Sequence, residues 1–409
     1  MTDRSNLIWP EAGISEVPYR IYTDPAIFDL EMERIFCGNG WSYVGLEAEI
    51  PESGDYLVTQ IGQRSVVITR DQDGEIHGFA NRCAHRGVKL CRQNKGNNRF
   101  FVCPYHQWSY DSRGGLRGVP FIKGVGGKGG MPADFDRAAH NLPRLAIRVH
   151  NGVIFGSFGE RPPKFEDYLG ETNLAYFNRV FDGRALKLLG YSRQLIPGNW
   201  KLMFENIKDP YHASLLHVFL VTFGLFRADQ DSQVQMDESG GHALLISRRG
   251  EQRKSDATKD IANLREDFVL NDPRLLDPVK EFPDNATVVM QTIWPNLIVQ
   301  QQSNTLALRQ IRPRSPGAFE LAWTFFGYCD DDEAMTRRRL RQANLMSSAG
   351  LVSADDSEVI KLAQDGITQY PDDRGVVLMG GTGRNNENHM VTETAVRAFY
   401  DHYRKVMDL

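Results

Sequence analysis

The sequence has no long apolar run and few cysteines. Its first twenty residues lack the stretch of about 7–15 apolar residues that follows basic residues in a secretory signal. No segment reaches the roughly 18 consecutive apolar residues of a membrane helix. The five cysteines are odd in number and scattered, which does not indicate a disulfide framework. We therefore expect a cytoplasmic protein that does not span a membrane.

The sequence also has no excess of basic over acidic residues. The 48 basic and 52 acidic side chains leave a net charge of -4, so the basic surface typical of a nucleic-acid-binding protein is not expected. No period of 20 to 50 residues repeats, which excludes a solenoid. Hydrophobic residues make up 41% of the 409 residues, enough for a sizeable core in two to four domains of roughly 100–200 residues each.

The first third of the chain is rich in short β-prone runs. An amphipathic helical pattern covers residues 26–37, and β-prone segments follow from residue 56 onward, with Asp73-Gly74 as a hairpin signal. Residues 124–134 are too rich in glycine for a regular strand and predict a surface loop. We therefore expect a small all-β domain over residues 41–158.

Beyond residue 158 the pattern is mixed, and it predicts an α+β domain over residues 159–409 with helices packed on one face of an antiparallel sheet. The N-terminal helical segment, residues 1–40, is expected to pack on this domain. The predicted strands are 186–196, 242–247, 286–293, 297–302, 306–311 and 319–328. The predicted helices are 200–218, 332–346, 355–364 and 392–406.

Two pairs of potential metal ligands stand out in the β-rich region. Cys83 and His85 are separated by one residue, and Cys103 and His106 by two, with seventeen residues between the pairs. They could be ordinary core residues, or the ligands of a structural zinc ion. However, each pair holds one cysteine and one histidine, which is the order that a Rieske [2Fe-2S] cluster needs, since one of its irons binds both cysteines and the other both histidines.

A second group of ligands lies in the following domain. His212 and His217 are about 140° apart on an ideal helix, so they can share a metal only if that helix is distorted or ends between them. Spacing alone also allows two ordinary histidines. Glu205 and Asp209 are acidic residues in an otherwise apolar stretch, and such groups are rarely buried without a partner. Two histidines and one carboxylate form the facial triad of non-haem Fe(II) oxygenases.

The cysteine and histidine pairs carry a resemblance to a known family. The pattern Cys-x-His-Arg-Gly followed by Cys-x-x-His-x-Trp resembles the Rieske domain of aromatic-ring-hydroxylating oxygenases. The resemblance implies that Cys83 and Cys103 bind one iron and that His85 and His106 bind the other. It also implies that Gly87 lets the backbone approach the cluster and that Trp108 shields it. Cys37, Cys91 and Cys329 are then ordinary thiols.

The segment 199–217 resembles the catalytic iron helix of the same family, with His212 and His217 as iron ligands. The family's third ligand is a distant carboxylate after a glycine, and the match here is Gly350-Leu-Val-Ser-Ala-Asp355-Asp356. By motif position we take Asp356 as the ligand. Asp355 could instead be a helix N-cap.

Two further positions in this segment match family residues. Asp209 matches an aspartate that links a Rieske histidine to a catalytic-iron histidine across a subunit boundary, which implies a ring, expected to be a trimer. Asn206 matches a residue near the iron, and Glu205 is expected to lie behind the ligands rather than to bind the metal.

The resemblance extends over nearly the whole chain and is strongest to large subunits of the salicylate 5-hydroxylase, anthranilate 1,2-dioxygenase and terephthalate dioxygenase types. It implies a helix-grip-like catalytic domain, a small β subunit in an α3β3 assembly, and a ferredoxin and reductase that supply electrons from NAD(P)H. The implied reaction uses O2 to hydroxylate an ortho-substituted benzoate. Salicylate would give gentisate, whereas anthranilate or a 2-halobenzoate would give a catechol. A Rieske protein that only transfers electrons, or a zinc-stapled binding protein, are the alternatives.

Three residues bear on the substrate. Arg309, on a predicted strand, is either the partner of an aromatic carboxylate or a solvent-facing arginine. Met390 stands where terephthalate-type relatives carry an arginine, which argues against a second carboxylate. Phe204 stands where salicylate hydroxylase-like sequences can carry a polar residue, and we place it with Arg309 and Met390 at the substrate site.

Overall fold

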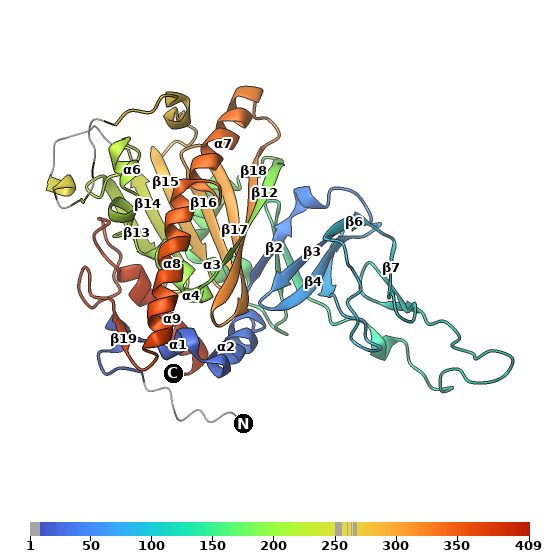
Figure 1. The fold of residues 1–409 in the computed structure, drawn as a ribbon. Coiled ribbons are helices and arrows are strands. Elements are labelled where there is room, and N and C mark those ends of the chain that lie inside the picture. The colour runs from blue at the N-terminus through green and yellow to red at the C-terminus, as the bar shows by residue number, and fades with distance from the viewer. Residues whose placement is uncertain (1–8, 250–255, 260, 263, 265–267) are drawn as a thin grey trace. The chain divides into compact units, whose positions relative to one another are not determined.

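A computed structural model describes residues 9–249, 256–259, 261–262, 264 and 268–409 (Figure 1). Contacts between Cα atoms divide the chain into two compact units, residues 36–163 and residues 1–35 together with 164–409. These boundaries differ slightly from the expected ones, at 40/41 and 158/159. Residues 1–8 of the expected N-terminal segment lie outside the described residues.

The unit formed by residues 36–163 contains three antiparallel sheets, ordered β10-β11-β2, β5-β4-β3-β6 and β7-β8-β9. The predicted hairpin at Asp73-Gly74 joins β4 to β5, and Gly74 has a positive φ of 84°. Its strands are β2 (Ser42–Leu46), β3 (Asp55–Ile61), β4 (Arg64–Arg70), β5 (Ile76–Ala80), β6 (Lys95–Asn97), β7 (Phe100–Val102), β8 (Ser109–Asp111), β9 (Leu116–Gly118), β10 (Ala146–His150) and β11 (Val153–Ser157).

The other unit is built around a seven-stranded antiparallel sheet ordered β12-β18-β17-β16-β15-β14-β13. Neighbouring strands are consecutive in the chain except for β12 and β18. The connections from β15 through β18 are short turns, whereas residues 249–285 separate β14 from β15. The strands of this sheet are β12 (Leu186–Ile196), β13 (Asp231–Met236), β14 (Ala243–Arg248), β15 (Ala286–Ile293), β16 (Leu297–Gln302), β17 (Thr305–Ser315) and β18 (Ala318–Tyr328).

Helices lie on both faces of this sheet, so the expectation that they cover only one face is wrong. Figure 1 shows α8 running across one face, and α4 packs on β14 and β15. On the opposite face, Tyr176 of α3 packs against Leu244 and Val289, and Gln291 donates a hydrogen bond to the Asn173 carbonyl. The longer helices are α3 (Phe165–Val180), α4 (Trp200–Lys208), α7 (Glu333–Met346), α8 (Leu351–Gln369) and α9 (Thr394–Met407). The short ones are α1 (Arg20–Thr23), α2 (Pro25–Glu31), α5 (Ala213–Leu216) and α6 (Val218–Thr222).

Residues 9–35 complete this second unit rather than preceding it. Strand β1 (Glu16–Pro18) pairs with β19 (Arg374–Val376). Glu31, at the end of α2, is fully buried and accepts hydrogen bonds from Trp200 Nε1, Lys201 Nζ and Tyr403 OH at 2.6–2.7 Å. Because a buried carboxylate needs such partners, this network fastens the N-terminal segment to α4 and α9.

Several predicted elements need correction. The expected helix 200–218 is three shorter helices, and the expected helix at 355 begins four residues earlier, at Leu351. Helix α3 was not predicted; non-helical φ and ψ at Gly170 interrupt it, so its apolar period is not continuous. Strand β13 was also not predicted, because its sequence DSQVQM is mostly polar at the edge of the sheet. The expected helix 26–37 is α-helical only as far as Glu31 and continues as a π-helical turn, Met32–Phe36.

Candidate metal centres and the adjoining pocket

The two Cys/His loops of the β unit have the same backbone pattern. In the first, Gly87 N donates to Cys83 O at 2.9 Å and Cys83 N donates to Val88 O at 2.8 Å. In the second, Gln107 N donates to Cys103 O at 3.0 Å and Cys103 N donates to Trp108 O at 2.8 Å. Each loop therefore turns back on itself. The residue four positions after each cysteine takes a positive φ, 72° at Gly87 and 59° at Gln107.

The side chains of these loops converge. Cys83 and Cys103 are each 2% exposed, and the His85 and His106 rings lie 4.6 Å apart. The Nδ1 atoms of both histidines are buried and have no hydrogen-bond partner among the described residues. Buried imidazole nitrogens are normally bonded, so two orphaned ones beside two buried thiols fit a metal cluster. The four residues could hold [2Fe-2S] in the mixed arrangement expected from the sequence.

Surrounding side chains shape this site. Trp108 is buried and stacks on His85, with ring centroids 4.7 Å apart and planes 5° apart. Tyr110 OH lies 3.3 Å from Cys83 Sγ, within hydrogen-bonding distance, and accepts a hydrogen bond from Ala84 N. Tyr110 was not predicted as part of the site. It lies in β8, two residues after Trp108, and alternation in extended backbone would have placed both side chains on one side.

The other cysteines differ from Cys83 and Cys103. Cys91 is buried, and burial raises the pKa of its thiol to about 12. Cys37 is half-buried and Cys329 is exposed. No disulfide joins any of these five described cysteines.

In the second unit, the helix that carries the predicted iron ligands is broken. Helix α4 ends at Lys208, and Asp209 Oδ1 accepts a hydrogen bond from Tyr211 N at 2.8 Å in the turn that follows. His212 and His217 flank the single turn α5, and His217 has non-helical φ and ψ of -92° and 60°. The break removes the angular separation of an ideal helix, and the two rings approach to 5.4 Å between centroids.

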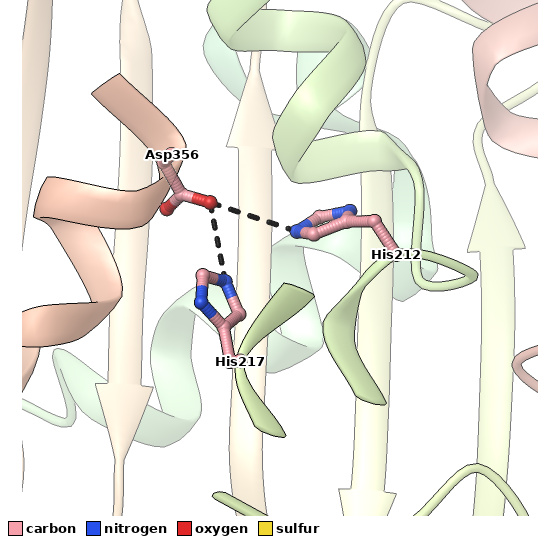
Figure 2. A group of neighbouring side chains, drawn as sticks. All are labelled: His212, His217 and Asp356. Atoms are coloured by element: carbon pink, nitrogen blue, oxygen red, sulfur yellow. Dashed lines mark ion pairs between the residues drawn. The ribbon is translucent and has the colours of Figure 1, made fainter. Parts of the chain in front are cut away.

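Asp356 on α8 completes a three-residue group with these histidines. Its Oδ1 atom lies 3.1 Å from His217 Nε2 and 3.7 Å from His212 Nε2. Figure 2 shows the three side chains pointing toward one another from separate elements. One ligand atom from each lies within 4.8 Å of the others, so the three could hold a single metal ion.

Asp355 has a different position. The helix N-cap is Gly350, so the expected N-cap role of Asp355 is wrong; Asp355 lies in the second turn of α8. Its Oδ2 atom is 3.2 Å from His217 Nδ1, the nitrogen that faces away from Asp356. Asp209 also lies behind its histidine, with Oδ2 3.5 Å from His212 Nδ1, but that nitrogen forms no hydrogen bond among the described residues. Asp355 fixes the His217 ring and leaves its Nε2 available to a metal.

The packing of these side chains shifts the pKa values of His212 and Asp356. Burial lowers the pKa of His212, but Asp209 and then Asp356 more than offset it, so the pKa of His212 is raised. Burial raises the pKa of Asp356, but the hydrogen bond and charge of His217 outweigh it and the pKa is lowered. Asn206 Nδ2 also donates to Asp356 Oδ1 at 3.1 Å. Asp356 is therefore held as a carboxylate.

Glu205 lies behind these residues. Its Oε1 atom accepts a hydrogen bond from Tyr400 OH, which in turn contacts Tyr22 OH at 2.7 Å. Burial raises the pKa of Glu205 to about 7, although the tyrosine hydrogen bonds lower it. Glu205 is not among the residues that line the pocket beside the candidate metal group.

That pocket opens between the His/His/Asp group and one face of the seven-stranded sheet. Its helical side and loops supply Asn206, Asp209, His212, His217, Asp356 and Met390. Its sheet side supplies Leu245, Ser247, Met290, Gln300, Gln302 and Arg309. The sheet residues belong to adjacent strands, and Leu245 pairs with Met290 and Met290 with Gln300, so they share one face.

The three residues expected at the substrate site have different positions. Arg309 is 2% exposed and lines the pocket, so the solvent-facing alternative is wrong. Met390 is also buried and lines the pocket. Phe204 does not line it: its ring stacks on Phe399 at 5.7 Å within an aromatic cluster. Phe204 therefore belongs to the core, because it lies on the face of α4 that packs toward α9.

The comparisons with known proteins agree with this geometry. The profile of the ring hydroxylating alpha subunit (catalytic domain) matches residues 174–409, and that of the Rieske [2Fe-2S] domain matches residues 40–127. The chain belongs to the ring-hydroxylating oxygenase alpha-subunit family. It is therefore an oxygenase component of the kind that carries a Rieske [2Fe-2S] cluster and a mononuclear non-haem iron. The zinc-stapled and purely electron-carrying alternatives do not fit this alpha subunit.

The similarity to individual alpha subunits spans nearly the full length. The salicylate 5-hydroxylase large oxygenase component of Ralstonia sp is 51% identical over 98% of this chain and 96% of its own. The anthranilate 1,2-dioxygenase large subunit of Burkholderia cepacia is 40% identical over 99% and 96%. The crystal structure of naphthalene 1,2-dioxygenase from Rhodococcus sp. bound to indole has a TM-score of 0.79 at 25% identity and covers 96% of this chain and 94% of its own.

Within the described residues, no helix of this alpha subunit is both long and apolar enough to cross a bilayer.

Proposed function

We propose that this alpha subunit hydroxylates an ortho-substituted benzoate, with salicylate as the first candidate and gentisate as its product. The observation that carries the proposal is the buried guanidinium of Arg309 in the pocket beside His212, His217 and Asp356. The 51% identity to the salicylate 5-hydroxylase component supports the choice of substrate.

Arg309 is a buried cation that forms no ion pair with any carboxylate of the described residues. Its Nε atom is buried with no hydrogen bond, its Nη2 atom contacts the Met290 sulfur at 3.5 Å, and its guanidinium lies 4.8 Å from the Trp323 ring centroid. Burial lowers its pKa to about 10, although the charge of Asp356 raises it, so Arg309 stays protonated at neutral pH. No carboxylate in the described part of the chain forms an ion pair with it. A carboxylate from the substrate would offset the cost of burying this charge.

Met390 supports a substrate with one carboxylate. It is 2% exposed and faces the same pocket, where it offers an apolar thioether and no cation for a second carboxylate. Anthranilate, which also has one carboxylate, is the second candidate, and the 40% identity to the anthranilate 1,2-dioxygenase subunit favours it.

We assign the metal ligands by geometry. Cys83 and Cys103 would hold one iron of the cluster and His85 and His106 the other, through the Nδ1 atoms that lack partners. His212, His217 and Asp356 would hold the mononuclear iron. When bound, that iron supplies reductive activation of dioxygen.

Around the mononuclear site, the chain's own residues position the ligands. Asn206 holds Asp356 through a hydrogen bond, while Asp355 and Asp209 lie behind His217 and His212. Arg309 would place the aromatic ring by its carboxylate, and the apolar wall of Leu245, Met290 and Met390 would exclude water from it.

Asp209 would also connect this subunit to a neighbour. One carboxylate oxygen faces His212 and the residue is only half-buried, so the carboxylate can accept a hydrogen bond from another chain. We propose that it meets a cluster histidine of a second copy in a trimer, with a small β subunit. A ferredoxin and a reductase that uses NAD(P)H would deliver the electrons, as in three-component systems of this family.

The test is oxygen uptake by the reconstituted system with salicylate, anthranilate, 2-chlorobenzoate and terephthalate, with the products identified. Gentisate from salicylate would support the first candidate, and catechol from anthranilate the second. Failure to oxidise any of these acids would overturn the proposal.

Arg309→Gln should raise the KM for the aromatic acid by at least about 30-fold, since a desolvated charge pair is lost. Arg314→Gln is the matched control, because Arg314 is a more exposed arginine on the same strand, paired with Glu320. Its KM should stay unchanged.

A further inference from the structure

Gln300 lies at the centre of the pocket's sheet wall. It is 1% exposed and lines the pocket from β16, where it pairs with Met290 of β15 on one side and Ala307 of β17 on the other. Side chains at paired positions share a face, and Arg309 lies two residues beyond Ala307 on the same face. Gln300 and Arg309 are therefore diagonal neighbours on one wall.

The amide of Gln300 has one satisfied end and one unsatisfied end. Its Nε2 atom donates to Gln302 Oε1 at 3.0 Å, and Gln302 lines the same pocket. Its Oε1 atom is buried and has no hydrogen-bond partner among the described residues. A buried acceptor left unpaired costs about 1–3 kcal/mol, so this oxygen is suited to receive a donor from a molecule in the pocket.

The guanidinium of Arg309 lies close to β16, the strand that carries Gln300. Arg309 starts from β17, yet its Nη2 atom contacts the sulfur of Met290, which lies on β15 beyond Gln300. The side chain therefore extends across β16, the strand that carries Gln300. A carboxylate bound to this guanidinium would hold its neighbouring ring substituent beside Gln300.

Building on the proposed function, we propose that Gln300 determines specificity by accepting a hydrogen bond from the substituent ortho to the substrate's carboxylate. The site would then take aromatic acids with an ortho O–H or N–H group and discriminate against those with an ortho halogen, which has no proton to donate. Arg309 would bind the carboxylate of the substrate, and Gln300 would accept the hydrogen bond from the ortho substituent.

The experiment measures dissociation constants by equilibrium dialysis on the anaerobic holoenzyme without its reductase, so that no turnover occurs. The ligands are salicylate, anthranilate and 2-chlorobenzoate. Gln300→Met keeps the length of the side chain and removes the acceptor. It should weaken the binding of salicylate and anthranilate about 10-fold and leave the binding of 2-chlorobenzoate equal or tighter. The selectivity ratio, which is the dissociation constant of 2-chlorobenzoate divided by that of salicylate or anthranilate, should therefore fall by about 10- to 100-fold.

Two other variants separate the explanations. Met290→Leu changes the apolar neighbour of Gln300 and should shift all three constants by the same factor. Gln302→Met frees the Gln300 amide and should lower the selectivity ratio by less than Gln300→Met does. An unchanged ratio in Gln300→Met, or an equal loss for all three ligands, would overturn the role of Gln300. If none of the three acids binds the wild-type holoenzyme, the proposed function itself fails.

Discussion

The two candidate metal centres are built in opposite ways. The four residues proposed to hold the cluster lie within 24 positions of the chain, on two loops with the same backbone hydrogen bonds. The three residues of the catalytic group come from a broken helix and from α8, with more than a hundred residues between His217 and Asp356. One centre is set by local turns, and the other by the packing of distant elements.

The difference shows what each centre depends on. The cluster loops need only a short β scaffold and a turn residue with positive φ, such as Gly87. The catalytic group needs α8 to be placed against the broken helix, and a carboxylate of α8, Asp355, holds the His217 ring in position. Damage to the fold of the larger unit should therefore affect the iron and spare the cluster.

The largest expected effect is that of His217→Ala. Removing one of three ligands should empty the mononuclear site, lower the iron content per chain by about a third and abolish hydroxylation, because an incomplete triad binds iron weakly. The visible absorption of the cluster should be unchanged. Loss of the cluster signal as well would show that the two centres are not built independently.

Asp209→Ala and Asp355→Ala compare the two carboxylates behind the histidines. Asp209→Ala should keep the full iron content yet lower turnover about 10- to 100-fold, because its proposed role is to couple the two centres. Asp355→Ala should instead weaken iron retention during dialysis against a chelator. Metal analysis and oxygen uptake on both variants check this, and coupled turnover at the normal rate in Asp209→Ala would contradict it.

Lys201→Met tests the scaffold of the catalytic unit. The change leaves the Glu31 carboxylate buried without its cationic partner, so the unfolding free energy of that unit should fall by about 3–5 kcal/mol. Chemical denaturation followed by tryptophan fluorescence and by cluster absorption can resolve the two units. The cluster transition should not move. Adding Glu31→Gln should recover part of the loss, since the unpaired charge is then gone.

The smallest effect is expected in the cluster loop itself. Gly87→Ala has room for its methyl group, with Arg82 Cδ 3.9 Å away, so the cost comes from the positive φ alone and should be about 1–2 kcal/mol. Gln107→Gly, at the equivalent turn of the other loop, should be nearly neutral. Thermal unfolding of the cluster unit measures both. A larger loss in Gln107→Gly would show that its side chain, not its backbone, matters.

The contrast between the centres also explains what the sequence could predict. The Cys/His pairs were identifiable because their spacing determines the loop geometry. Strands β12, β15 and β16 were predicted with their observed bounds, since apolar runs between turns are local signals. The proposed iron ligands were predicted only through resemblance to a family, because helical spacing alone placed His212 and His217 on different faces.

Other features depended on tertiary packing. Whether Arg309 faces solvent or the pocket could not be decided from an alternating strand, because alternation does not say which face is covered. Phe204 was placed at the substrate site, yet its ring packs with Phe399 from α9, nearly two hundred residues away. The orphaned oxygen of Gln300 had no sequence signal at all.

The buried partnership of Glu31 with Lys201 and Tyr403 has a consequence for biosynthesis. The cluster unit is one continuous stretch, so it can fold while the rest of the chain is still being translated. Residues 9–35 must wait, since their partners Tyr403 and β19 are translated long after the cluster unit. A chain released before these residues are made would thus have a folded cluster unit and a catalytic unit that cannot complete its fold.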